Sequence, residues 1–183
     1  MMDFIIAKVI KYAKEELKDK DRIHGFKHAR TTAKFAEIIA KEEFANIKLC
    51  IISAWLHDIA CKGKRSCIKE TIEDNHGIDS AIKSKMFLLS LGLTQSEINE
   101  ICIAISGHCF PNIQKSITSK ILWDSDKLNL FSKEVEKVYL SNWTIKLGNL
   151  NQAKKQIKKE KEYYLKYFNT RTAKDIARKA LPS

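Results

Sequence analysis

Residues 46–60 are apolar on nearly every face of a helix, which predicts a helix at the centre of the fold rather than on its surface. The apolar run at residues 49–56 ends directly in the pair His57-Asp58. A carboxylate and a titratable imidazole are costly to bury unless a partner compensates them. A bound metal ion is the most economical compensation, so this pair is the first candidate for a functional site.

The rest of the chain also favours helices. Only two prolines and six glycines interrupt its 183 residues, and no segment shows the clear apolar–polar alternation of a strand. Thr94 and Glu97 have the spacing of a capping box, which predicts the start of one helix. Helices are expected over residues 3–18, 24–43, 46–60, 77–91, 94–108, 118–140, 142–168 and 171–180. The chain is therefore predicted to be an all-α bundle of seven or eight helices, in a single domain over residues 1–183.

Two further residues complete a set of metal-ligand types around the pair. His28 lies 29 residues before His57 in a helix-like stretch, and Asp126 lies 68 residues after Asp58. Neighbouring residues on a helix point about 100° apart, so His57 and Asp58 can both reach an ion beside the helix. Imidazole and carboxylate ligands suit divalent Mn, Fe, Co, Ni, Zn or Mg, and the lack of a cysteine among the candidates argues against a structural zinc site. Four protein ligands leave room for a water, which a metal ion can activate for attack on a phosphoryl group.

Three segments resemble the motifs of the HD superfamily of metal-dependent phosphohydrolases, whose name comes from the His-Asp pair. They are residues 24–30, similar to the first-histidine helix of the family, residues 54–59, similar to its central motif, and residues 124–129, similar to its last motif. The resemblance covers about residues 22–130, and residues 169–177 are similar to a C-terminal helix start of bacterial and archaeal members. It implies an HD-type domain with the basic helices of residues 131–183 packed on the part that carries the motifs.

The resemblance also implies a function and the residues that perform it. In the last motif the ligand is usually the acid directly before a basic residue, which indicates Asp126 and not Asp124. The expected metal ligands are therefore His28, His57, Asp58 and Asp126, with His57 and Asp58 as the catalytic pair. The expected reaction is hydrolysis of a phosphoester or phosphoanhydride of a phosphorylated small molecule, in the first place a nucleotide. Manganese or another divalent metal is the expected cofactor, as one ion or two.

Two histidines between the pair and the last motif have several possible roles. In some HD proteins the residues equivalent to His76 and His108 bind a second metal ion, which the aspartate of the pair bridges. In others the equivalent histidines contact the phosphate of the substrate, and a purely structural role is the third alternative.

The segment after the pair departs from part of the family. Nucleotidase-type members carry a glutamate in the form HDxxE at the position where this chain has Cys61, so their general acid–base assignment is not carried over. Basic residues follow instead, namely Lys62, Lys64 and Arg65. Lys62 is expected to balance the charge of a substrate phosphate, as is Lys127 in the last motif. The alternative is that these side chains are simply solvated.

The charge of the chain leaves other functional classes open. Residues 151–183 hold ten Lys and Arg against three Asp and Glu, in a chain of net charge +11, and such a basic surface can attract nucleic acid. A metal-stabilised nucleic-acid-binding or regulatory module is therefore the main alternative, and a di-iron oxygenase of the HD type is a further one.

The predicted location is the cytoplasm, without membrane contact. The chain has five cysteines without a CxxC pair, no secretory signal and no long apolar run. The sequence leaves the oligomeric state open.

Overall fold

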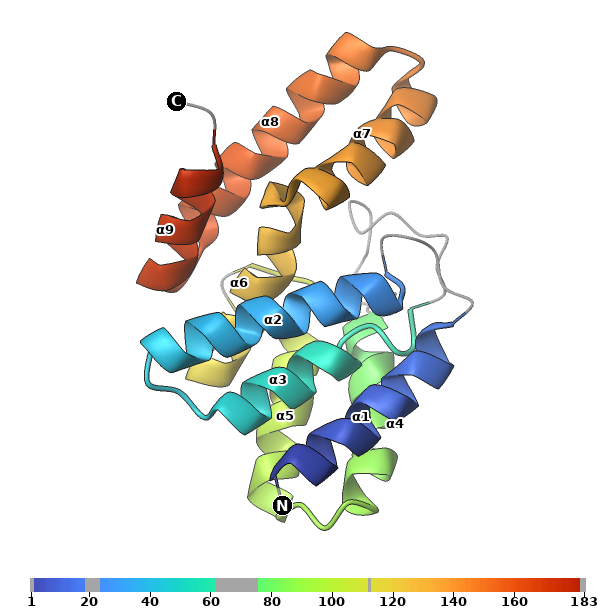
Figure 1. Cartoon of the computed structure of the whole chain (residues 1–183), viewed down its shortest axis with the longest axis vertical. Helices are drawn as coiled ribbons and strands as arrows, with labels where there is room; N and C mark the ends of the chain where they lie inside the picture. Colours follow the sequence, from blue (N-terminus) through green and yellow to red (C-terminus); the bar gives the residue numbers. More distant parts are fainter. Residues whose placement is uncertain (1, 19–23, 62–75, 112, 182–183) are drawn as a thin grey trace.

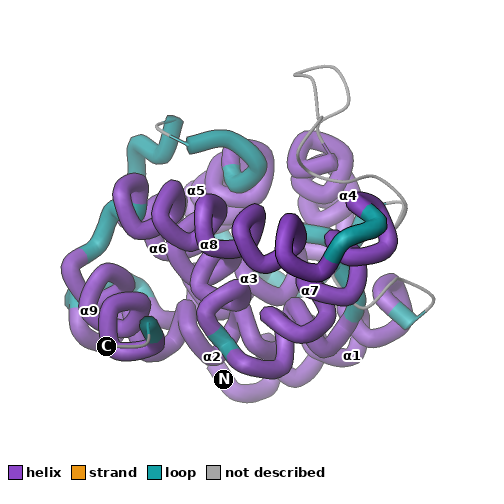
Figure 2. The backbone as a smooth tube through the Cα atoms, turned by 90° about the horizontal axis from the view of Figure 1, so that it is seen from above, coloured by secondary structure: helices purple, strands orange, loops and turns teal. Residues whose placement is uncertain are grey.

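The described part of the chain is built from helices. This computed structural model describes residues 2–18, 24–61, 76–111 and 113–181. In these ranges it contains nine α-helices, one short 3-10 helix and no strand (Figure 1 and Figure 2). In chain order they are α1 (Met2–Leu17), α2 (Phe26–Glu42), α3 (Ile47–Leu56), α4 (His76–Leu89), α5 (Gln95–Gly107), α6 (Ile117–Leu128), η3 (Asn129–Phe131), α7 (Lys133–Leu147), α8 (Leu150–Tyr167) and α9 (Arg171–Ala180). The prediction of an all-α fold is confirmed, with one α-helix more than the upper number expected.

Helix α3 lies at the centre of the core, as its sequence predicts. Asn46 caps its first turn, because the Asn46 side chain accepts a hydrogen bond from the backbone N–H of Leu49 at 3.2 Å. Seven of its ten residues are buried, and α3 packs against α1, α2, α5 and α6. The helix ends at Leu56, although it was expected to continue to residue 60. The pair His57-Asp58 therefore lies in the turn that follows the helix.

The segment expected as one helix over residues 118–140 is instead divided into α6, η3 and α7. The division lies at Ser132, which has extended backbone angles and is the N-cap of α7. Its hydroxyl accepts a hydrogen bond from the backbone N–H of Val135 at 3.4 Å. A serine that caps a new helix satisfies a backbone donor that would otherwise lack a partner, so the prediction of one continuous helix was wrong here.

The expected boundary between the next two helices is also displaced. A helix was expected over residues 142–168, whereas α7 continues to Leu147 and ends at Gly148, whose φ is +64°. Glycine adopts this left-handed conformation at little cost, and a residue in this conformation ends a right-handed helix. Asn149 then caps α8 by accepting a hydrogen bond from the backbone N–H of Gln152 at 3.0 Å. As a result α7 and α8 pack against each other as an antiparallel pair, which extends away from α1 and α3 in Figure 1.

A buried carboxylate joins the C-terminal helix to the core. Asp124 of α6 accepts hydrogen bonds from the backbone N–H groups of Asn169 at 2.9 Å and Thr170 at 2.8 Å. It also accepts hydrogen bonds from the side chains of these two residues, at 3.0 and 2.7 Å. Thr170 in turn is the N-cap of α9, and its hydroxyl accepts a hydrogen bond from the backbone N–H of Ala173. Asp124 thereby fixes the start of α9, which packs against α6 and α2.

The described ranges contain four cysteines, and all four are free thiols: Cys50, Cys61, Cys102 and Cys109. None of the helices in this part of the chain combines the length and the hydrophobicity that a membrane span requires.

Helix α5 begins with the capping box that the sequence predicts. Thr94 Oγ1 accepts a hydrogen bond from the backbone N–H of Glu97 at 3.3 Å, and Glu97 Oε2 accepts one from the backbone N–H of Thr94 at 2.8 Å. We expect Thr94→Ala to lower the free energy of unfolding by about 1 kcal/mol, because the backbone N–H of Glu97 loses its acceptor. Urea denaturation measures the change, and Thr94→Ser is the control that keeps the hydroxyl. An alanine variant as stable as the wild type would show that the cap contributes nothing.

Candidate metal centre

Six side chains from five parts of the chain lie close together, each at or near one end of a helix. They are His28 on α2, His57 and Asp58 after α3, His76 at the start of α4, His108 after α5, and Asp126 on α6. The first five are buried, and the side chain of Asp126 is 10% exposed. All the histidines and acids that the sequence predicts for the site are therefore brought together.

Four of these residues form what we call the first donor group: His28, His57, Asp58 and Asp126. His28 Nε2 lies 3.1 Å from His57 Nε2 and 3.0 Å from Asp126 Oδ1. Asp58 Oδ2 lies 3.5 Å from His28 Nε2 and 3.2 Å from His57 Nε2. With metal–ligand bonds of about 2.1 Å, adjacent ligand atoms lie about 3.0 Å apart on an octahedron and about 3.4 Å apart on a tetrahedron. The first donor group therefore has the spacing of ligands around one divalent ion.

The other oxygen of Asp58 faces a second donor group, which consists of this oxygen and the imidazoles of His76 and His108. Asp58 Oδ1 lies 3.0 Å from His76 Nε2 and 3.3 Å from His108 Nε2. The two imidazole nitrogens lie 3.2 Å from each other. Asp58 thus presents one oxygen to each donor group, which is the position of a bridging carboxylate between two ions.

Backbone carbonyl groups orient two of the imidazoles. His57 Nδ1 lies 2.8 Å from the carbonyl oxygen of Ala54, and His108 Nδ1 lies 2.6 Å from that of Ile105. A carbonyl oxygen only accepts hydrogen bonds, so Nδ1 carries the proton in each ring and Nε2 faces the donor groups. Metal-binding histidines are commonly held in this way through the nitrogen that does not bind the metal.

Buried carboxylates in the first donor group have protonation states that suit metal binding. Burial raises the pKa of Asp58, but the surrounding histidines, with His57 first, hold that pKa well below its usual range. Burial likewise raises the pKa of Asp126, while Lys127 and His28 hold it well below the usual range. The pKa of His28 itself is lowered, mainly because the ring is buried. Both carboxylates are therefore ionised at neutral pH and His28 is neutral, as metal ligation requires.

The two acids of the last motif have different surroundings. Asp126 lies in the first donor group, and its Oδ2 accepts a hydrogen bond from Lys127 Nζ at 2.6 Å. Asp124 points toward Asn169 and Thr170 instead, because residues two apart on a helix lie about 200° apart around its axis. Lys127 is thus held at the edge of the centre by Asp126 rather than being fully solvated, with 15% of its side chain exposed.

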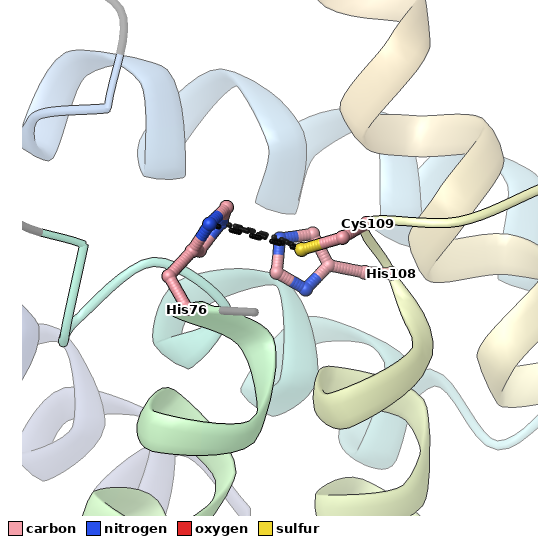
Figure 3. A group of neighbouring side chains, drawn as sticks. All are labelled: His76, His108 and Cys109. Atoms are coloured by element: carbon pink, nitrogen blue, oxygen red, sulfur yellow. Dashed lines mark hydrogen bonds between the residues drawn. The ribbon is translucent and has the colours of Figure 1, made fainter. Parts of the chain in front are cut away.

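A cysteine lies against the second donor group, and the sequence analysis left every cysteine out of the site. Cys109 Sγ lies 3.6 Å from His76 Nε2 and 3.7 Å from His108 Nε2, and the three side chains point toward one another in Figure 3. Burial raises the pKa of this thiol, but His108 and His76 lower it to about 6. Burial lowers the pKa of His108, while Cys109 and Asp58 raise it to about 10. The only sequence signal for Cys109 is its position directly after His108.

Besides Cys109, four residues outside the predicted set line the same cavity as the two donor groups: His24, Leu130, Tyr139 and Tyr164. His24 is buried, and its ring centroid lies 6.4 Å from that of His28 and 6.2 Å from that of His76. Tyr139 and Tyr164 reach the cavity from α7 and α8. The cavity is therefore closed partly by helices that carry no motif of the site.

The basic residues after the His57-Asp58 pair and those of the C-terminal helices are placed differently. Lys62, which was expected to bind substrate, lies outside the described residues, as do Lys64 and Arg65. In the C-terminal part, Lys161 of α8 is buried and pairs with Glu136 of α7 at 2.9 Å, so this lysine belongs to the helix packing. Binding of nucleic acid by the basic C-terminal helices stays a prediction.

Comparisons with known proteins found one matching family and several similar folds. The sequence profile of the HD domain matches residues 25–130. Among solved structures, a predicted HD superfamily hydrolase from an uncultured Thermotogales bacterium has 24% sequence identity and a TM-score of 0.68, over 95% of this chain and 83% of that chain. Bacillus subtilis YpgQ in complex with ADP has 16% identity and a TM-score of 0.74, over 98% and 89% of the two chains. An HD-superfamily hydrolase from Bacillus thuringiensis has 20% identity and a TM-score of 0.72, over 98% and 90%. At these sequence identities the structural similarity shows the fold alone. A comparison with curated proteins found no match.

Proposed function

The chain belongs to the HD domain family, and from this premise we propose that it is a metal-dependent phosphohydrolase that cleaves a phosphoester or phosphoanhydride bond of a nucleotide. The main support for the proposal is the geometry of the first donor group. It places two imidazole nitrogens and two carboxylate oxygens at the mutual distances of ligands around one ion, at the wall of a small cavity that Lys127 also lines. Such a set of ligands suits manganese, among other divalent metals.

His28, His57, Asp58 and Asp126 would hold the ion. A divalent ion in this position supplies an activated water and stabilises negative charge on a phosphoryl oxygen. The role of Asp58 is to keep both donor groups in place through its two oxygens. Lys127, which Asp126 holds, adds a positive charge at the edge of the cavity that can balance a phosphate oxygen. His76 and His108 would bind a second ion or the substrate phosphate.

A nucleotide is the proposed substrate for two reasons. Tyr139 and Tyr164 line the cavity, and an aromatic ring there can stack on a base. In addition, the YpgQ protein, which shares the fold, forms a complex with ADP. Neither reason selects one nucleotide, so a panel of nucleotides and small phosphoesters is the appropriate set of test substrates.

Removal of the metal is the first test of this proposal. We expect protein treated with EDTA and then freed of chelator to release no phosphate from the panel, and added Mn²⁺ to restore the activity. The physical reason is that without an ion the cavity has no group to activate water or to offset the charge of the phosphate. Phosphate release is followed colorimetrically, with free Mn²⁺ and no protein as the control. Full activity in metal-free protein would rule the proposal out.

A further inference from the structure

The environment of Cys109 differs from that of a packing cysteine. Cys102, which like Cys109 is partly buried, donates a hydrogen bond from its thiol to the backbone carbonyl of Ala81 at 3.5 Å. Cys109 Sγ instead lies near two imidazole nitrogens, those of His76 and His108, and these nitrogens also face a carboxylate oxygen. Sulfur, nitrogen and oxygen atoms that can all bind a cation are thus gathered at one point, whereas the thiol of Cys102 has an ordinary backbone acceptor.

We propose that Cys109 is a metal ligand, and that its thiolate makes a second metal position selective for zinc. This inference deepens the proposed function and rests on it, because the second position shares Asp58 with the first donor group. The ligands of this position are Cys109 Sγ, His76 Nε2, His108 Nε2 and Asp58 Oδ1. The first donor group has no sulfur, so the two positions differ in chemistry.

The distances fit a tetrahedral zinc ion. With a zinc–sulfur bond of about 2.3 Å and zinc–nitrogen bonds of about 2.05 Å, a tetrahedron separates sulfur from nitrogen by about 3.6 Å. Cys109 Sγ lies 3.6 Å from His76 Nε2 and 3.7 Å from His108 Nε2. The nitrogen–nitrogen distance is 3.2 Å, and Asp58 Oδ1 lies 3.0 and 3.3 Å from the two nitrogens, close to the roughly 3.3 Å that separates nitrogen and oxygen ligands of a tetrahedral zinc ion.

The identity of the ligands determines the metal preference. Thiolate is a soft ligand that binds zinc well, whereas manganese and magnesium favour hard oxygen ligands. Two imidazoles and one carboxylate oxygen beside a single thiolate give a four-coordinate set that zinc commonly accepts. Zinc at this position would bind the thiolate of Cys109, and the thiol proton would be released to solvent. The first donor group has no sulfur ligand, so the protein is expected to hold zinc at the second position even when manganese occupies the first.

Cobalt(II) provides the direct test, because a thiolate bound to cobalt gives a charge-transfer band in the near ultraviolet that nitrogen and oxygen ligands do not give. We expect metal-free full-length protein titrated with Co²⁺ to show this band together with the visible bands of bound cobalt. Cys109→Ser and Cys109→Ala are expected to lose the charge-transfer band and one zinc equivalent per chain, while their visible bands from the first donor group remain. Cys102→Ser is the matched control and should keep the charge-transfer band.

The outcomes separate this inference from the proposed function. Visible cobalt bands and Mn²⁺-dependent phosphate release, without a charge-transfer band in the wild type, would overturn the role of Cys109 and leave the proposed function standing. A charge-transfer band that persists in both Cys109 variants would also overturn it. Circular dichroism confirms that each variant keeps its helices, and Cys109→Ala serves as the second variant if Cys109→Ser is poorly folded.

Discussion

Replacement of Asp58 by asparagine is expected to reduce metal-dependent phosphate release by about 10³-fold or more. The two oxygens of Asp58 lie in different donor groups, Oδ2 at 3.2 Å from His57 Nε2 and Oδ1 at 3.0 Å from His76 Nε2. Asparagine has nearly the same shape but no charge, and its amide nitrogen cannot bind a cation. A single substitution therefore weakens both metal positions at once.

Initial rates at saturating Mn²⁺ measure this effect, and equilibrium dialysis against Mn²⁺ shows whether the ion is lost with the activity. Asp79→Asn is the matched control, because Asp79 is an exposed acid in the first turn of α4 and lies outside the donor groups. The control is expected to keep wild-type activity. An Asp58→Asn variant with more than about a tenth of the wild-type rate would contradict a metal-binding role for this residue.

Replacement of Asp124 by alanine is expected to lower the free energy of unfolding by about 3 kcal/mol or more. The Asp124 carboxylate is fully buried and accepts four hydrogen bonds, two of them from the backbone N–H groups at the start of α9. Its removal leaves the buried donors of Thr170 and the partly buried donors of Asn169 without an acceptor, and a buried donor without a partner is costly. We therefore expect α9 to detach from α6 and the whole chain to unfold at lower urea concentration.

Asp126→Ala is the matched comparison for this prediction, because Asp126 lies two residues further along the same helix and faces the first donor group. We expect it to lose Mn²⁺ affinity by at least about 100-fold, with a smaller loss of stability than Asp124→Ala. Urea unfolding of both variants in the presence of chelator, followed by Mn²⁺ titration, separates the two roles. The assignment of the two acids would be wrong if Asp124→Ala unfolded at the same urea concentration as the wild type.

The sequence predicted which side chains lie together where the burial of a polar residue requires a physical explanation. His57 and Asp58 stand at the end of an apolar helix, and such polar groups need a compensating partner. His28 and Asp126 are the matching ligand types in helical segments, and all four meet in the first donor group. The all-α fold followed from the scarcity of helix-breaking residues.

Features that depend on three-dimensional packing were not predicted. Cys109 resembles a small hydrophobic residue in sequence, and only the fold of α4 and α5 shows that its thiol lies beside His76. Tyr139 and Tyr164 lie in helices without a motif, and the direction in which those helices pack decides that they line the cavity. The break at Gly148 was predictable in principle, because glycine followed by a capping asparagine is typical of the end of one helix and the start of the next.

Anomalous diffraction at the manganese absorption edge, from crystals of the full chain grown with Mn²⁺, would locate the proposed ion most directly. The expected result is a peak within bonding distance of His28 Nε2, His57 Nε2, Asp58 Oδ2 and Asp126 Oδ1. Manganese bound only elsewhere on the chain, with these four side chains free of any ion, would contradict the proposal that they form the catalytic metal site.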